Sequence, residues 1–233
     1  REQHRLGNHA PVNVTMSRRF DRQERFDALV RAGRLTAARH PSVLIHAAGS
    51  GVGTAAVQIA GALGARVVAL SRDRARRERL TGLGAGCVID PTAADALEQI
   101  RAATDGGPSV VLDLVGADAW ELNARALRPG GRWVLVGLLS GSRVSVDLGV
   151  LLTRRLELIG TVLRSRSTSE KRQVVERFVR DAGGFLRDGT IRPIVDRVVP
   201  LAEAADAHRA IERNEHFGKI VLAVGDREAQ SRP

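Results

Sequence analysis

The sequence predicts an α/β fold, a doubly wound parallel sheet of six strands that is followed by a C-terminal segment of a different pattern. The chain has 233 residues, 43% of them hydrophobic, which is enough for a sizeable core. From residue 42 onward, short β-branched runs alternate with amphipathic helical stretches, as in βαβ units. This alternation changes after residue 166. We therefore divide the chain into an N-terminal appendage (1–40), an α/β domain (41–166) and a C-terminal segment (167–233).

The expected strands are short apolar runs bounded by Gly, Asp or Arg, and they lie at residues 42–46, 66–70, 87–89, 109–114, 132–138 and 156–163. Helices are expected between them, because apolar residues recur three or four apart at residues 52–64, 73–84, 93–104, 118–127 and 147–154. Six parallel strands with crossovers on both faces make a complete doubly wound domain.

The C-terminal segment reads as helix, strand, helix and strand, at residues 169–189, 193–200, 201–213 and 219–224. Two strands separated by one helix are too few for an independent core. We expect this segment to pack on another sheet or to complete one.

Composition limits the class of protein. The most apolar runs are under ten residues, too short to cross a bilayer as helices. The start of the chain lacks the apolar core of a secretory signal, and the single cysteine, Cys87, cannot form an internal disulfide, so we expect a cytoplasmic protein. The net charge of +10 comes mostly from arginine, with nine arginines against four acidic residues in 1–40. Codon bias from a GC-rich genome would explain that charge, and so would binding to nucleic acid or to an anionic surface.

A glycine-rich turn follows the first strand, in the segment that begins VLIHAAGSGVGTAAVQIA. Strand, turn, helix and strand follow one another, which is the context that a dinucleotide-binding (Rossmann) motif requires. Gly51 and Gly53 let the backbone approach a pyrophosphate, and the helix beginning near Val52 directs its N–H groups and positive end toward it. Gly49, Gly51 and Thr54 fit the three-glycine template with Thr in the last place. The alternative is a tight turn without a ligand.

The end of the second strand predicts which dinucleotide binds. An acidic residue there would hold the ribose hydroxyls of NAD, whereas this chain has Ser71 and Arg72, followed by Arg74, Arg76 and Arg77. A guanidinium suits the 2′-phosphate of NADP. We therefore predict NADP(H) as the cofactor, with the alternative that the arginines, above all Arg74 and Arg77, are the solvated face of a helix.

These features resemble the medium-chain dehydrogenase/reductase superfamily, and within it the zinc-independent, zeta-crystallin-like quinone oxidoreductases. The matching stretches, in chain order, are VLIHAAGSGVGTAAVQIA, LGA, GGRWVLVGLLSG, LIGTVLRSR and FGKIVL. The resemblance covers about residues 26–224. Family members also carry an N-terminal GroES-like β-barrel, for which the residues before 26 offer no strands. The resemblance therefore implies that only a remnant of this second, GroES-like domain is present. The C-terminal segment would return to this truncated catalytic domain.

The resemblance also implies the cofactor-binding residues. They are, for the pyrophosphate, Ser50, Gly51, Val52 and Gly53; for the 2′-phosphate, Ser71, Arg72 and Arg76; for the nicotinamide side, Gly137, Leu138, Leu139, Thr161, Val162 and Leu163; and near the cofactor, Lys219. One departure is that Asp90 and Pro91 stand where the family has an aromatic residue near the adenine.

The implied reaction is hydride transfer from NADPH to a quinone or another activated enone, in a homodimer joined through the sixth strand. Activity is expected to be reduced where the barrel wall is lacking. No catalytic residue is identified: His46 reads as structural, and Asp113 as either structural or functional. No metal site is expected, because Cys87 stands alone and the six histidines lack ligand spacing. Two alternatives stay open, a non-catalytic NADPH-binding module and a basic RNA-binding protein.

Overall fold

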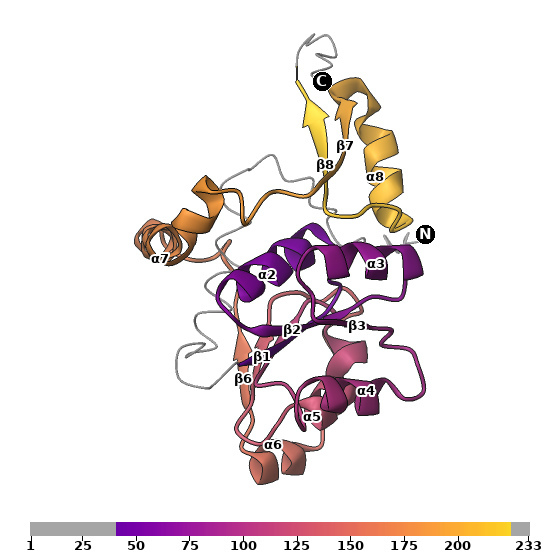
Figure 1. Ribbon diagram of the computed structural model, residues 1–233, viewed down its shortest axis with the longest axis vertical. Coiled ribbons are helices and arrows are strands. Elements are labelled where there is room, and N and C mark those ends of the chain that lie inside the picture. Colours follow the sequence, from indigo (N-terminus) through magenta and orange to yellow (C-terminus); the bar gives the residue numbers. More distant parts are fainter. Residues whose placement is uncertain (1–40, 225–233) are drawn as a thin grey trace, which may run out of the picture.

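Six parallel strands form the central sheet of the computed structural model, which describes residues 41–224 (Figure 1). They are β1 (Ser42–Ile45), β2 (Arg66–Leu70), β3 (Cys87–Ile89), β4 (Val110–Asp113), β5 (Arg132–Leu135) and β6 (Glu157–Gly160). Their spatial order is β3-β2-β1-β4-β5-β6, so the predicted doubly wound sheet is confirmed. Predictions for residues 1–40 and 225–233 lie outside the described residues.

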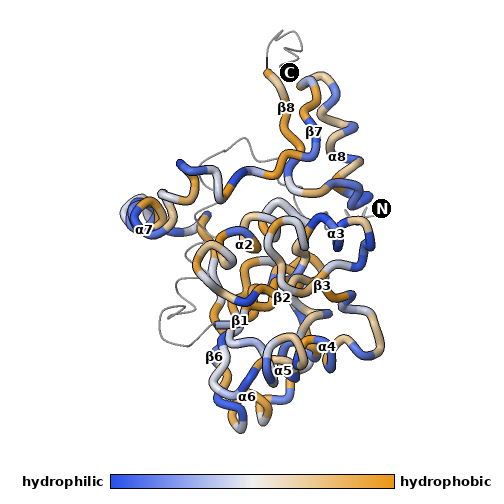
Figure 2. Tube along the Cα trace, in the orientation of Figure 1, coloured by the Kyte–Doolittle hydropathy of each residue, from blue (hydrophilic) through white to orange (hydrophobic). Residues whose placement is uncertain are grey.

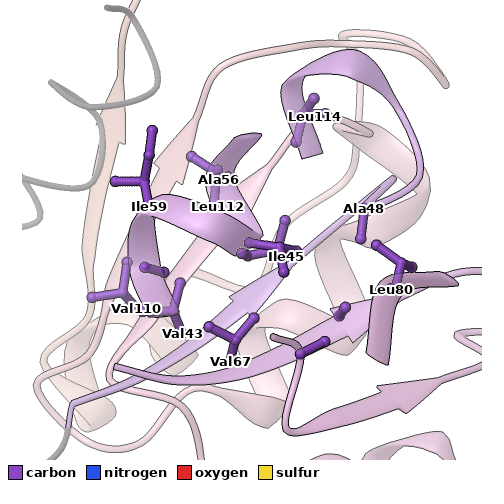
Figure 3. Packing of buried hydrophobic residues seen from close by; sticks show 14 of the residues in the cluster. Val43, Ile45, Ala48, Ala56, Ile59, Val67, Leu80, Val110, Leu112 and Leu114 are labelled. Atoms are coloured by element: carbon purple, nitrogen blue, oxygen red, sulfur yellow. The ribbon is translucent and has the colours of Figure 1, made fainter. Parts of the chain in front are cut away.

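Helices cover both faces of the sheet, because successive residues of the central strands are buried in cores on opposite faces (Figure 1). They are α2 (Gly51–Ala62), α3 (Arg74–Gly82), α4 (Ala96–Ala103), α5 (Trp120–Ala126) and α6 (Leu148–Arg154). Val43 and Ile45 belong to the core beneath α2 and α3, which Figure 3 shows, whereas Leu44 belongs to the core of the opposite face. The first strand is therefore buried on both sides and fixes the start of α2.

Strands β5 and β6 end three residues earlier than predicted, at Leu135 and Gly160. Beyond β5 the chain turns toward the loop that follows β4: the N–H of Leu139 donates to the carbonyl of Leu114 (3.2 Å) and that of Ser140 to the carbonyl of Val115 (2.9 Å). The apolar residues after β5 therefore form a loop that is hydrogen-bonded to the loop after β4, and they do not extend the strand.

The C-terminal segment begins with α7 (Thr168–Arg187), whose capping box joins Ser167 and Glu170. Then follow β7 (Val195–Pro200), α8 (Ala204–Glu212) and β8 (Lys219–Ala223). The two strands pair in parallel as a separate small sheet, which projects away from the six-stranded sheet (Figure 1). Figure 2 shows β8 as a largely apolar strand.

Specific contacts attach this segment to the first βαβ unit. The Gln58 side chain, buried on α2, donates to the carbonyl of Arg192 (3.1 Å) and accepts from its N–H (3.0 Å). Phe217 is buried in the core beneath α2 and α3. Within residues 41–224, no helix has the length and apolarity needed to cross a membrane.

Candidate functional site

The predicted site residues gather at the carboxyl edge of the sheet, where the strand order reverses between β1 and β4. In open α/β sheets this edge is where ligands bind. The turn before α2, the loop after β5 and the loop after β6 all leave the sheet there. Residues that are far apart in the sequence are thus brought to one side of the domain.

The N-terminus of α2 offers free donors to an anion. Ser50 is the N-cap, and its Oγ accepts from the N–H of Gly53 (3.0 Å). The N–H groups of Gly51 and Val52 have no intrahelical acceptor, since they open the helix. The first turn carries no acidic residue, so the positive end of the helix dipole is not neutralised. This geometry fits the pyrophosphate of a dinucleotide.

Gly53 has a packing role at the same turn. A Cβ built on it would lie 2.5 Å from the carbonyl oxygen of Ala47 and would also meet the backbone of Ala48. Only glycine lets α2 start this close to β1. Because the Gly53 N–H is already bound by Ser50, its predicted contact with the pyrophosphate stays a prediction.

Lys219, at the start of β8, lies across Gly51. A Cβ built on Gly51 would be 2.9 Å from Lys219 Cγ, and closer still to the next two carbons of that side chain. The backbone holds it there: Gly218 bridges to Ser50, and its N–H donates to the carbonyl of Gly49 (2.9 Å). A lysine side chain thus borders the N-terminus of α2.

At the end of β2, the predicted 2′-phosphate residues differ in their availability. Ser71 is buried, and its hydroxyl donates to the Asp73 carbonyl (3.4 Å). Arg72 is exposed. The acid that follows in the sequence, Asp73, is the N-cap of α3, where its carboxylate accepts from the N–H of Arg76 (3.1 Å). No acidic residue stands directly at the end of β2.

Two arginines of α3 are held by other parts of the chain. The Arg76 guanidinium donates to Oδ1 (3.0 Å) and to the carbonyl of Asn214. Arg77 donates to the carbonyls of Ser71 (3.1 Å) and Arg72 (3.2 Å), so it braces the end of β2 instead of being a solvated side chain.

Asp90, which replaces the family's aromatic residue, ends the third strand with a tight polar turn. Its carboxylate accepts from the N–H (3.0 Å) and hydroxyl (2.7 Å) of Thr92 and from Arg77 (3.0 Å). The hydrogen bonds from Thr92, helped by Arg77, lower the pKa of Asp90. The carboxylate therefore stays charged and binds Arg77.

The predicted nicotinamide side presents apolar surface. The side chains of Leu138 and Leu139 are 51% and 74% exposed, and Val162 is exposed as well. Thr161 accepts from Arg166 (2.7 Å), and Leu163 is buried. Gly137 lies against Leu114 of the neighbouring loop. The structure therefore brings these residues to the carboxyl edge, while their contact with a cofactor stays a prediction.

Below this edge lies a buried polar network centred on Asp113. Its carboxylate accepts from the N–H groups of Val115 (2.7 Å) and Gly116 (3.1 Å), and from Asn123 Nδ2 (3.1 Å) and Trp133 Nε1 (2.9 Å). Since Asn123 donates to Asp113, its Oδ1 accepts from His46 Nε2 (2.6 Å). With four donors bound, Asp113 is a structural residue that shapes the loop after β4.

Burial lowers the pKa of His46, outweighing the opposing effects of the Asp113 charge and the Asn123 hydrogen bond. His46 is therefore neutral at pH 7 and buried in this network, as its predicted structural role requires. Because both side chains are buried in this network, neither His46 nor Asp113 is available at the carboxyl edge as an acid.

Sequence reasoning missed the anchoring role of Gln58, Asp90 and Asn214. Gln58 carries a readable signal, because a polar residue interrupts the apolar face of α2. Asn214 carries none, since its partner Arg76 is 138 residues away in the chain.

A family model described as zinc-binding dehydrogenase matches residues 51–180. The chain is 32% identical over 184 residues to the quinone oxidoreductase of Pseudomonas aeruginosa, covering 78% of this chain and 56% of that protein. It is also 34% identical over 186 residues to a mycocerosic acid synthase-like polyketide synthase of Mycobacterium tuberculosis, covering 78% of this chain and 9% of that protein.

Solved structures show the same architecture. A crystal structure described as an NAD-dependent alcohol dehydrogenase superposes with a TM-score of 0.75 at 32% identity, over 88% of this chain and 57% of that one. The Escherichia coli quinone oxidoreductase complexed with NADPH gives a TM-score of 0.75 at 28% identity, over 88% and 63%. The chain thus spans about half to two thirds of the length of the stand-alone enzymes that it matches.

The family description implies zinc, yet residues 41–224 gather no three His, Cys, Asp or Glu side chains that could hold a metal ion. The described residues therefore do not supply a zinc-ligand set, and no chemical step is assigned to zinc.

Proposed function

Because this chain belongs to the zinc-binding dehydrogenase family, we propose that it is an oxidoreductase that uses NADPH to reduce a quinone or a related activated enone. When bound, NADPH supplies the hydride from C4 of its nicotinamide, and the protein supplies binding and orientation. The zeta-crystallin-like branch is the subtype we favour, on the Ser50 to Gly53 turn and the FGKIVL stretch.

The N-terminus of α2 at the reversal of strand order is the observation that carries this proposal. The N–H groups of Gly51 and Val52 and the positive end of the helix are suited to a pyrophosphate, and Lys219 adds a cationic side chain. Leu138, Leu139 and Val162 would present an apolar surface to the nicotinamide and the acceptor. Because the loop after β5 is hydrogen-bonded to the loop after β4, Leu138 and Leu139 are held in place.

NADPH is the preferred cofactor in this proposal, because Ser71 stands where a carboxylate would repel a 2′-phosphate and Arg72 is exposed beside it. A charge-assisted hydrogen bond contributes about 1.5–3 kcal/mol, so a preference of about tenfold or more over NADH follows from one such contact.

Titration of NADPH and NADH, followed by protein and nicotinamide fluorescence, tests the cofactor. Arg72→Ala should lower the affinity for NADPH and leave that for NADH unchanged, and Gly51→Asp should abolish binding of both. Equal affinities of the unaltered chain for the two cofactors would refute the NADPH assignment. Reduction of 1,4-benzoquinone or 9,10-phenanthrenequinone, measured beside the titration, tests the acceptor class.

The two other functions that the sequence left open have less support. A non-catalytic module and an RNA-binding protein are not suggested by the oxidoreductase names of the relatives. Retention on RNA that weakens with salt and is unaffected by NADPH would favour RNA binding. A cytoplasmic location stays a prediction.

A further inference from the structure

We propose that Asn214 sets how strongly the chain prefers a 2′-phosphorylated cofactor, because it competes with the 2′-phosphate for the guanidinium of Arg76. The inference rests on the proposed function, since only a cofactor with a 2′-phosphate would enter this competition. Asn214 lies in the loop between α8 and β8, and it is not among the residues predicted to bind the cofactor.

The contact between the two residues uses the binding edge of the arginine. Nη1 of Arg76 donates to Oδ1 of Asn214 (3.0 Å), and Nη2 donates to the carbonyl of the same residue. A guanidinium binds phosphate with paired N–H groups in a fork. One asparagine thus takes one N–H of each terminal nitrogen, a pair of the kind that a phosphate binds in a fork.

The surroundings of Arg76 leave it little freedom to serve both partners. Its side chain is only 13% exposed, and its Nε lies 3.8 Å from the carboxylate of Asp73. Its Cδ would be 3.0 Å from a Cβ built on Gly49, so the aliphatic part lies against the turn before α2. A phosphate that binds the same pair of N–H groups must therefore displace Asn214 from at least one of them.

Asn214 is itself fixed in place. It has a φ of +55°, in the left-handed region, and its N–H donates to the carbonyl of Ile211 (2.9 Å). Four residues later, Gly218 is tied to the turn before α2 through Gly49 and Ser50. The loop therefore presents the Asn214 oxygens to Arg76 in a defined position, so the competition depends on this one side chain and its carbonyl.

Two substitutions change the competition without disturbing the backbone, because Gly and Asp both tolerate a positive φ better than most residues do. Asn214→Gly removes Oδ1 and leaves the carbonyl contact. Asn214→Asp replaces Oδ1 by a carboxylate, which binds Arg76 more strongly and repels a phosphate. We expect Asn214→Gly to raise the affinity for NADPH about threefold to tenfold and Asn214→Asp to lower it about tenfold, with NADH unchanged.

The experiment titrates the unaltered chain and both variants with NADPH and NADH, and with adenosine 2′,5′-bisphosphate and 5′-AMP as probes that lack the nicotinamide. Both probes report binding alone, without turnover. In an Arg76→Ala background the gain from Asn214→Gly should disappear, because the contested guanidinium is gone.

A loss of NADPH affinity in Asn214→Gly would overturn the inference, since it would mean that Asn214 orients Arg76 for the phosphate. So would equal changes for NADPH and NADH, or a gain that persists in the Arg76→Ala background. If the unaltered chain binds neither dinucleotide, the proposed function fails. If it binds NADPH and both variants keep that affinity, only this inference fails.

Discussion

Replacing Asp113 by Asn should destabilise the fold severely, although the two side chains have nearly the same shape. The carboxylate accepts four hydrogen bonds from buried donors, two per oxygen: the N–H groups of Val115 and Gly116 on Oδ1, and the side chains of Asn123 and Trp133 on Oδ2. An amide keeps one acceptor oxygen and replaces the other by a donor. In Asp113→Asn, either orientation of the amide therefore turns its NH₂ group toward two donors.

The magnitude follows from how many of those donors can find another acceptor. A buried donor left without a partner costs about 1–3 kcal/mol. Asn123 can flip its own amide, but its Nδ2 would then face His46 Nε2, which would have to give up its proton. Trp133 Nε1 has no such alternative. The expected loss is about 1–3 kcal/mol if Asn123 and His46 rearrange and about 2–6 kcal/mol if they do not, against a total stability of about 5–15 kcal/mol.

Urea unfolding followed by circular dichroism measures this loss. Asp118→Asn is the matched control, because it makes the same chemical change on an exposed residue five positions further along the chain, where a change within about 0.5 kcal/mol is expected. If Asp113→Asn moved the unfolding midpoint no more than Asp118→Asn does, the view of Asp113 as a structural centre would be refuted.

Three further predictions concern pH, the turn before α2 and the edge of the sheet. Burial holds the pKa of His46 below its unfolded-state value of about 6.5, so stability should be lost as pH falls below about 6.5 toward the folded-state pKa. Urea midpoints measured across this range should fall less in His46→Gln than in the unaltered chain. An equal fall in both would contradict the assignment. Gly53→Ala should lower the free energy of unfolding by about 1–3 kcal/mol and weaken NADPH binding, because the new Cβ meets the Ala47 carbonyl. In Gly61→Ala, on the same helix, the new Cβ meets nothing closer than 3.9 Å, so this control should be neutral or stabilising. Similar effects of the two would count against the packing role of Gly53. Strand β6 lies at the edge of the sheet, and Leu158 on it is 46% exposed, so we expect a homodimer that pairs through this strand. Sedimentation at micromolar concentration should show the dimer, and Leu158→Lys should weaken it. A monomer of the unaltered chain would speak against pairing through β6.

The arrangement of the six strands could be predicted because each strand carries its own local signal. In β1, Val43 and Ile45 face one core and Leu44 the other, so the strand reads as a continuous apolar run. The turn before α2 could be predicted for the same reason, since Ser50 is a capping residue directly before a helical pattern. In both cases the residues that decide the structure are neighbours in the sequence.

The ends of the strands and the long-range contacts could not be predicted in this way. The segment after Leu135 is as apolar as the strand before it, and it leaves the sheet because its N–H groups bind the loop after β4. The role of Arg77 at the end of β2 was hidden for a similar reason: its acceptors there are the carbonyls of Ser71 and Arg72, and every residue has a carbonyl. A contact between two loops imposes no repeating pattern of apolar residues, so the sequence gives no sign of it.

The same long-range contacts link the small β7–β8 sheet to the candidate cofactor site. Lys219 of β8 lies across Gly51, and Asn214 holds Arg76, so the proposed pyrophosphate and 2′-phosphate positions are both bordered by the segment that carries β8. Binding free energies are coupled reciprocally. If a 2′-phosphate takes Arg76 from Asn214, one attachment of the β7–β8 sheet is lost, while the bridge at Gly218 and the buried Phe217 remain. By the same linkage, any change that loosens the α8–β8 loop should favour NADPH over NADH.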